Sequence, residues 1–196
     1  FASHNYLIPM QNMVPYPHKP PLLFWYIIAA WHLFGASATV ARVALSLFPL
    51  GCLFLTAKLT KQLFPKNKVM PFVAACVLFI SMECFYLMAG LVHFDFMVCF
   101  FSLLIMYSSI RLFCQTRHKR LYQLILLIAP TLAVLTKGPV FFLYVFPFLF
   151  SCFLIYKDSR QQYQVKRLFL AFFLILIGSF LSLIWVIPAC LAGGDA

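Results

Sequence analysis

Acidic residues are scarce in this chain. Its 196 residues include 4 Asp or Glu against 15 Lys or Arg, a formal net charge of +11, and charged residues make up only 10%. Soluble domains carry about 25% charged and about 45–50% apolar residues, whereas this chain is 64% hydrophobic. The composition excludes a soluble globular protein, a disordered chain and a nucleic-acid-binding protein with a basic surface, and it predicts an integral membrane protein.

The chain also lacks the short motifs of several enzyme classes. GxGxxG, P-loop, HExxH and GxSxG are absent, so nucleotide binding or hydrolysis by those routes finds no support. The 7 Cys lie in apolar runs without CxxC spacing, which is typical of small buried apolar residues. Because the chain begins with Phe1 and no signal peptide precedes it, we interpret it as a fragment of a longer protein.

Apolar runs divide the chain into three parts. Residues 1–21, with five Pro, predict an extended external loop. Residues 22–34 would form a helix of about 20 Å, too short for a hydrocarbon core of about 30 Å, and predict an interfacial helix that Gly35 closes. Residues 36–196 predict an all-α polytopic membrane domain with about six spans. The expected spans are residues 38–60, 69–90, 93–113, 121–136, 139–156 and 168–188.

Basic residues orient these spans. Three loops hold twelve of the 15, four in each: Lys58, Lys61, Lys66, Lys68; Arg111, Arg117, Lys119, Arg120; Lys157, Arg160, Lys166, Arg167. The positive-inside rule predicts that these loops are cytoplasmic. The remaining charges, apart from Asp158, then map to the external side: Lys19, Arg42, Lys137, Glu83, Asp95 and Asp195.

The external charges are the candidate site residues, because ionisable groups within spans are costly and usually mark function. Lys19, before Pro20-Pro21, suits a contact to a lipid phosphate. Arg42 lies one turn into the first long span and needs an anionic partner, while Lys137 lies at the tip of a tight hairpin turn. Glu83 would pair with either of these two cations. The structural alternatives are a snorkelling lysine, an ion pair and a solvated turn lysine.

Asp95, at the head of the third span, is open to several roles. It suits a base, a metal ligand, a partner for Arg42 or a helix N-terminal charge. His93 lies two residues before it, and both would bind a divalent ion together with His18, although HxD is a weak metal signal. The external cluster of cations and carboxylates beside interfacial aromatic residues fits a lipid-linked phosphate substrate.

A series of motifs runs along nearly the whole chain. In order, it consists of Tyr16-x-x-Lys19-Pro20-Pro21-Leu22-x-x-Trp25, Phe34-Gly35, Arg42, Asp95, Leu135-Thr136-Lys137-Gly138-Pro139, Trp185-x-x-Pro188 and Gly193-Gly194. This series resembles the bacterial members of the protein O-mannosyltransferase-like GT-C glycosyltransferases. That group includes the aminoarabinose transferase that modifies lipid A.

The resemblance implies a GT-C-type helical bundle in the bacterial inner membrane. It implies transfer of a sugar, with inversion, from a polyprenyl-phosphate carrier to a lipid A, glycan or protein acceptor on the external face. The motif positions imply that Lys19 contacts the carrier phosphate and that Asp95 corresponds to the family's second acid. The main catalytic acid would lie upstream of Phe1, so we expect the fragment alone to be inactive. His18 stands where relatives often have an acid, which weakens the metal hypothesis.

Two other classes of function stay open. A transporter or flippase module for a lipid-linked or anionic substrate predicts inverted repeats and broken helices at mid-membrane, and the sequence has no internal repeat. The second class, a non-catalytic membrane subunit, would not account for the external charges. We further expect Arg42 to face the interior or an external cavity, with Asp95, Glu83 or a lipid phosphate within reach.

Overall fold

The computed structural model describes residues 10–11, 14–15, 20–63, 69, 72–73, 76–77, 94–114, 118–156 and 162–193. Two short strands, β1 (Met10–Gln11) and β2 (Val14–Pro15), pair antiparallel. The other elements are helices: α1 (Leu22–Phe34), α2 (Ala38–Leu63), α5 (Asp95–Cys114), α6 (Lys119–Lys137), the 3-10 helix η1 (Gly138–Phe141), α7 (Phe142–Tyr156), α8 (Gln162–Leu181) and α9 (Leu183–Gly193). The predicted all-α class is confirmed.

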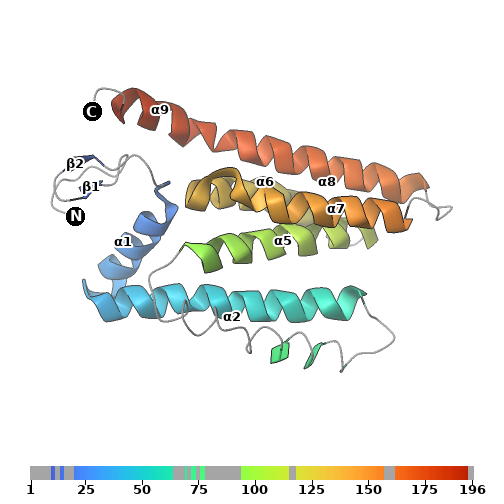
Figure 1. Cartoon of the computed structure of the whole chain (residues 1–196), viewed down its shortest axis with the longest axis horizontal. Helices are drawn as coiled ribbons and strands as arrows, with labels where there is room; N and C mark the ends of the chain where they lie inside the picture. Colours follow the sequence, from blue (N-terminus) through green and yellow to red (C-terminus); the bar gives the residue numbers. More distant parts are fainter. Residues whose placement is uncertain are drawn as a thin grey trace.

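The long helices lie roughly along one axis (Figure 1). In Figure 1, α2, α5 and α7 run one way along the bundle, while α6 and α8 run back. The short η1 connects α6 to α7 at the end where α5 begins. Helix α1 lies obliquely across that same end and contacts α2 and α6.

Four stretches of the described residues are long and apolar enough to cross a membrane: Ala38–Leu63, Asp95–Cys114, Lys119–Leu154 and Lys166–Leu191. The third of these includes α6 and most of α7, which run in opposite directions. The 13-residue α1 is also apolar, but it is shorter than these four candidate membrane spans. The expected span at 69–90 falls almost entirely outside the described residues.

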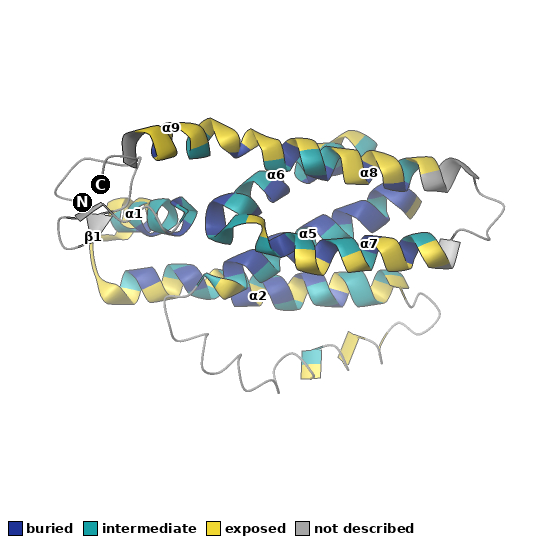
Figure 2. Ribbon diagram, turned by 45° about the horizontal axis from the view of Figure 1, so that its top comes forward, coloured by how far each residue is buried: buried dark blue, intermediate teal, exposed yellow. Residues whose placement is uncertain are grey.

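Helix α5 is the central helix of the bundle (Figure 2). Its side chains Met97 and Ile105 are among the largest that are fully buried. Around it, α6 and α8 approach each other closely at Gly178, where an added Cβ would lie 2.3 Å from the carbonyl oxygen of Leu127. The Thr131 hydroxyl donates to the Gly178 carbonyl at 2.6 Å. The absence of a side chain at position 178 therefore allows the two backbones to meet.

Large apolar side chains cover the outside of the bundle. Leu47 on α2 is 59% exposed, Phe150 on α7 is 62% exposed and Ile184 on α9 is 75% exposed. In Figure 2 the exposed residues lie mainly on the outer helices α2, α7, α8 and α9. A soluble monomer rarely exposes contiguous apolar surface of this extent. These faces are therefore suited to contact with lipid or with further apolar helices.

The two ends of the bundle differ in charge. At one end, the Nε of Arg111 donates to the Tyr122 hydroxyl at 3.0 Å, and Nη1 of Arg167 donates to the Phe113 carbonyl at 3.2 Å. These bonds join the end of α5 to the starts of α6 and α8. We call this the basic end, and its described cations are Lys58, Lys61, Arg111, Lys119, Arg120, Lys166 and Arg167. The other end, where α5 begins, is called the Asp95 end.

Candidate functional site

An ion pair marks the Asp95 end. The Nζ of Lys137 lies 2.5 Å from Oδ1 of Asp95, and the two side chains are 38% and 48% exposed. Asp95 is the first residue of α5 and Lys137 the last residue of α6. Because these helices are antiparallel, a carboxylate at the positive end of one helix dipole meets an ammonium at the negative end of another. Both charges therefore lie where the local field favours them, at a solvent-accessible position.

The turn after α6 holds Lys137 in place. Thr136 is completely buried, and its hydroxyl donates to the Leu132 carbonyl at 2.7 Å. Gly138 ends the helix with φ 73° and ψ −158° and donates its N–H to the Val134 carbonyl. That backbone conformation is essentially restricted to glycine. Phe141, fully buried, anchors the other side of the turn, so the lysine projects from a firmly packed corner.

Aromatic contacts bring the start of α1 to the same place. The rings of Phe24 and Phe94 meet edge to face with centroids 6.1 Å apart, and Phe94 directly precedes Asp95. The rings of Trp25 and Trp185 meet at 6.5 Å, which joins α1 to α9. These contacts join segments far apart in the sequence at the end of the bundle where the ion pair lies.

Two hydrogen bonds join α1 to α2 and to Ser37, the residue directly before α2. The Tyr26 hydroxyl donates to the Ala44 carbonyl at 3.0 Å, and Nε1 of Trp31 donates to the Ser37 carbonyl at 2.8 Å. Burial raises the pKa of Tyr26 above its ordinary value. These bonds span the Gly35 bend, where φ is 89°, and they set the angle at which α1 crosses the bundle end.

A hollow of about 490 Å³ lies between α1 and α2. Its lining is almost wholly apolar: Tyr26, Ala29, Ala30, Leu33, Phe34, Thr39, Val40, Val43, Ala44 and Leu47. Arg42 is exposed and lies on α2 within one turn of Thr39 and Val43. An apolar hollow with a cation on the same helical turn suits an amphiphile that carries a negative headgroup.

The structure thus joins two of the predicted site residues and separates a third from them. Asp95 and Lys137 form a pair. Arg42 has no hydrogen bond or ion pair within the described part of the chain, so Asp95 is not its partner. The predicted site residues Lys19, Glu83, His18 and His93 lie outside the described residues. Among the residues that are described, no three His, Cys, Asp or Glu side chains gather into a metal site.

The sequence reasoning missed the pairing of Asp95 with Lys137. The sequence analysis considered Arg42 as the ion-pair partner of Asp95, and Glu83 as the partner of Lys137. The signal was available in the topology, because a hairpin after the third span returns the Lys137 turn to the level at which that span begins. The contact between Trp25 and Trp185 was also missed, although both residues belong to the motif series.

The sequence profile of the dolichyl-phosphate-mannose-protein mannosyltransferases matches residues 18–185. The chain belongs to this family. The match includes the Lys-Pro-Pro segment, the Asp95–Lys137 pair, Trp25 and Trp185, so the membership predicted from the motif series is confirmed. Among curated protein sequences, none matches the chain.

Two solved structures share the fold of this mannosyltransferase family member. They are crystal structures of ArnT from Cupriavidus metallidurans, in the apo state (TM-score 0.75) and bound to undecaprenyl phosphate (TM-score 0.71). Each has 18% sequence identity, and each alignment covers 99% of this chain and 35% of ArnT. The chain therefore spans about a third of those proteins. Together with the apolar spans, the family and the fold establish an integral membrane protein of the GT-C type.

Proposed function

We propose that this protein acts in the transfer of a sugar from a polyprenyl-phosphate carrier to a lipid, glycan or protein acceptor. The carrying observation is the family match over residues 18–185, which includes the exposed Lys137–Asp95 pair. An exposed ion pair contributes only about 0.2–1 kcal/mol to folding. Such a pair is therefore better explained by what it binds than by the stability it provides.

The donor chemistry calls for cations. When the acceptor attacks the anomeric carbon, the bond from that carbon to the carrier phosphate oxygen breaks, and the phosphate leaves with the electron pair. Fixed positive groups that meet the growing negative charge lower the barrier most effectively. We assign Lys19 to the phosphate on the strength of the motif, with Lys137 and Arg42 as further candidates. ArnT has been crystallised with undecaprenyl phosphate, which supports a carrier of that class here.

The acceptor chemistry calls for a carboxylate. The attacking hydroxyl or amine must lose its proton as the new bond forms, and a positioned carboxylate is a suitable general base. In our proposal Asp95 supports this proton transfer indirectly, by holding Lys137 in position. The apolar hollow between α1 and α2 would receive the isoprenoid tail. Arg42, which lies on the same turn of α2 as Thr39 and Val43, would offer a cation to the headgroup. No protein-bound metal is required by these steps.

The proposal places this chemistry on the external face of a bacterial inner membrane. The basic end would then be cytoplasmic, as the positive-inside rule predicts. The Asp95 end would face outward, where the carrier-linked sugar and the acceptor meet.

The test is sugar transfer by the purified full-length protein from a radiolabelled polyprenyl-phosphate donor. We expect Lys19→Ala to reduce transfer by about 10- to 150-fold, because a charge-assisted contact is worth about 1.5–3 kcal/mol. Lys19→Arg should recover only part of the activity, since a planar fork does not replace a point charge in a fixed site.

The matched control is Arg120→Ala, which removes an exposed cation at the opposite end of the bundle. Its transfer rate should equal that of the wild type, and the melting temperature of all variants should stay unchanged. Full activity in Lys19→Ala would contradict the phosphate role. Absence of transfer by the wild type, together with transbilayer movement of the carrier, would instead favour a flippase.

A further inference from the structure

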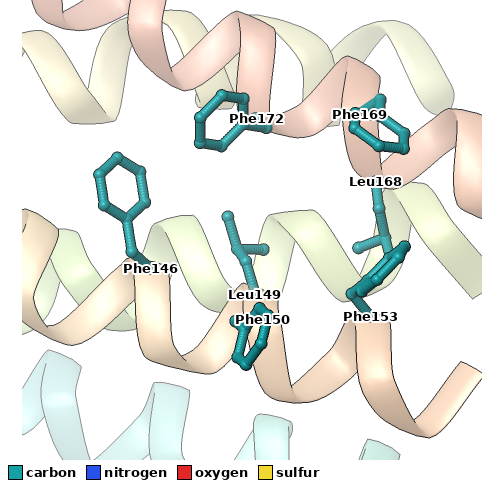
Figure 3. A pocket seen from close by; sticks show the side chains of 7 residues that line it. All are labelled: Phe146, Leu149, Phe150, Phe153, Leu168, Phe169 and Phe172. Atoms are coloured by element: carbon teal, nitrogen blue, oxygen red, sulfur yellow. The ribbon is translucent and has the colours of Figure 1, made fainter.

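A second apolar hollow lies on the side of the bundle, between α7 and α8 (Figure 3). Its volume is about 400 Å³, within the range of about 300–1,000 Å³ that is typical of ligand pockets. The lining residues are Phe146, Leu149, Phe150, Phe153, Leu168, Phe169 and Phe172. Leu149 and Leu168, each 8% exposed, form the floor, whereas Phe150 and Phe169, each 62% exposed, form the rim.

This hollow begins at the basic end. The rings of Phe153 and Phe169 meet edge to face at 6.4 Å on that side, and Phe146 approaches Phe172 at 5.5 Å on the other. From Phe146 to Phe153 the helix rises by about 10 Å. The hollow therefore runs inward from the basic end through about a third of a hydrocarbon core of about 30 Å.

Two cations lie on the turn of α8 next to the basic end of the hollow. Lys166, exposed, and Arg167, half-buried, directly precede Leu168 on α8. Arg167 is held by the bond from Nη1 to the Phe113 carbonyl, and its other N–H groups have no partner within the described residues. The described part of the basic end contains no carboxylate. No described carboxylate at this end therefore balances the charge of these two cations.

We propose that this hollow binds an anionic phospholipid from the leaflet at the basic end. One acyl chain would lie between α7 and α8, against the two leucines of the floor. The phosphate would contact Lys166 and Arg167, because guanidinium and phosphate form paired, charge-assisted hydrogen bonds. Basic residues at a membrane surface attract anionic lipids, and the adjoining hollow gives such a lipid a defined position.

A neighbouring hollow provides a comparison within the same molecule. It lies where α8 is followed by α9, has a volume of about 510 Å³ and is lined by Ile177, Phe180, Leu181, Leu183, Ile184, Ile187 and Pro188. Its size and apolar character resemble those of the first hollow. Residues 168–193, however, contain no Lys or Arg. If apolar surface alone attracted lipid, both hollows would be occupied equally.

The experiment uses the purified protein in lipid nanodiscs with a trace of phosphatidylglycerol that carries a photoreactive diazirine in its acyl chain. After illumination, mass spectrometry maps the crosslinked residues. We expect labelling of the α7–α8 hollow to exceed that of the α8–α9 hollow by about tenfold, as two phosphate-facing cations would produce. Unlabelled phosphatidylglycerol should compete, whereas phosphatidylcholine should not.

Charge variants then test the two cations. Lys166→Gln combined with Arg167→Gln should reduce labelling about tenfold, and Arg167→Lys should retain most of it. The control pair, Lys119→Gln with Arg120→Gln, removes the same charge from α6 at the same end. Lys166→Gln alone alters only an exposed side chain and still predicts a loss of labelling if the double variant is unstable.

Several results would overturn the proposal. They are equal labelling of the two hollows, equal competition by phosphatidylcholine, or an equal loss of labelling in the control pair. Stronger competition by undecaprenyl phosphate than by phosphatidylglycerol would identify a polyprenyl carrier as the occupant instead. None of these outcomes depends on sugar transfer, so this proposal and the proposed function can fail separately.

Discussion

The Lys137–Asp95 pair offers a sharp test of how a carboxylate serves a lysine. If Asp95 acts by positioning Lys137, then Asp95→Asn should reduce sugar transfer about tenfold, and Lys137→Ala about 100-fold, within the range for charge-assisted contacts. The double variant should be no worse than Lys137→Ala alone, because the role of the carboxylate disappears with the lysine. The measurement is a double-mutant cycle on the transfer rate.

Folding provides the control for that cycle. Both side chains are more than one-third exposed, so each single variant should change the free energy of unfolding by no more than about 0.5 kcal/mol. Additive losses of activity would show that Asp95 acts independently of Lys137. A large loss of stability would instead show that the pair serves mainly the junction between α5 and α6.

Helix packing can be tested at two glycines that differ in what surrounds them. At Gly178 an added Cβ would meet the backbone carbonyl oxygen of Leu127 at 2.3 Å, whereas at Gly51 it would meet the Phe100 ring at 2.6 Å. A backbone cannot move without separating two helices, but a ring rotates. We therefore expect Gly178→Ala to destabilise the protein by about 1–3 kcal/mol, and Gly51→Ala by clearly less.

Thermal unfolding in detergent, followed by circular dichroism, checks this ranking. Thr131→Val is a useful companion, because it removes the hydrogen bond to the Gly178 carbonyl while retaining the shape of the side chain. Unfolding temperatures that fall equally in the two glycine variants would show that α6 and α8 are less tightly joined than the structure implies.

The orientation of the whole bundle is the broadest prediction. In a variant without native cysteines, Pro139→Cys reports the turn at the Asp95 end and Arg120→Cys reports the basic end; both positions are exposed. A membrane-impermeant maleimide should label position 139 in intact cells, and position 120 only after permeabilisation, because basic loops stay cytoplasmic. The reverse pattern would invert the proposed topology and remove the external site.

Local features of the sequence predicted the class of fold and the family. Long apolar runs are sufficient for a membrane-spanning helix, because such a helix satisfies its own backbone hydrogen bonds in lipid. The Lys-Pro-Pro and Thr-Lys-Gly-Pro motifs were sufficient for the family, which the profile match confirms. The glycine of the second motif lies at the end of α6 with a positive φ, which a local turn requires irrespective of the rest of the chain.

The partners of the charged residues depended on the packing of distant segments. Arg42, Asp95 and Lys137 all mapped to one side by topology, but a side assignment does not say which charges touch. The antiparallel contact of α5 with α6 selects Asp95 for Lys137. Likewise, the sequence assigned Lys166 and Arg167 to a cytoplasmic loop. Only the packing of α7 beside α8 shows that a hollow begins at the next residue, Leu168. Composition and motifs are local properties of the sequence. Ion pairs and cavities, in contrast, form between helices that are far apart in the sequence.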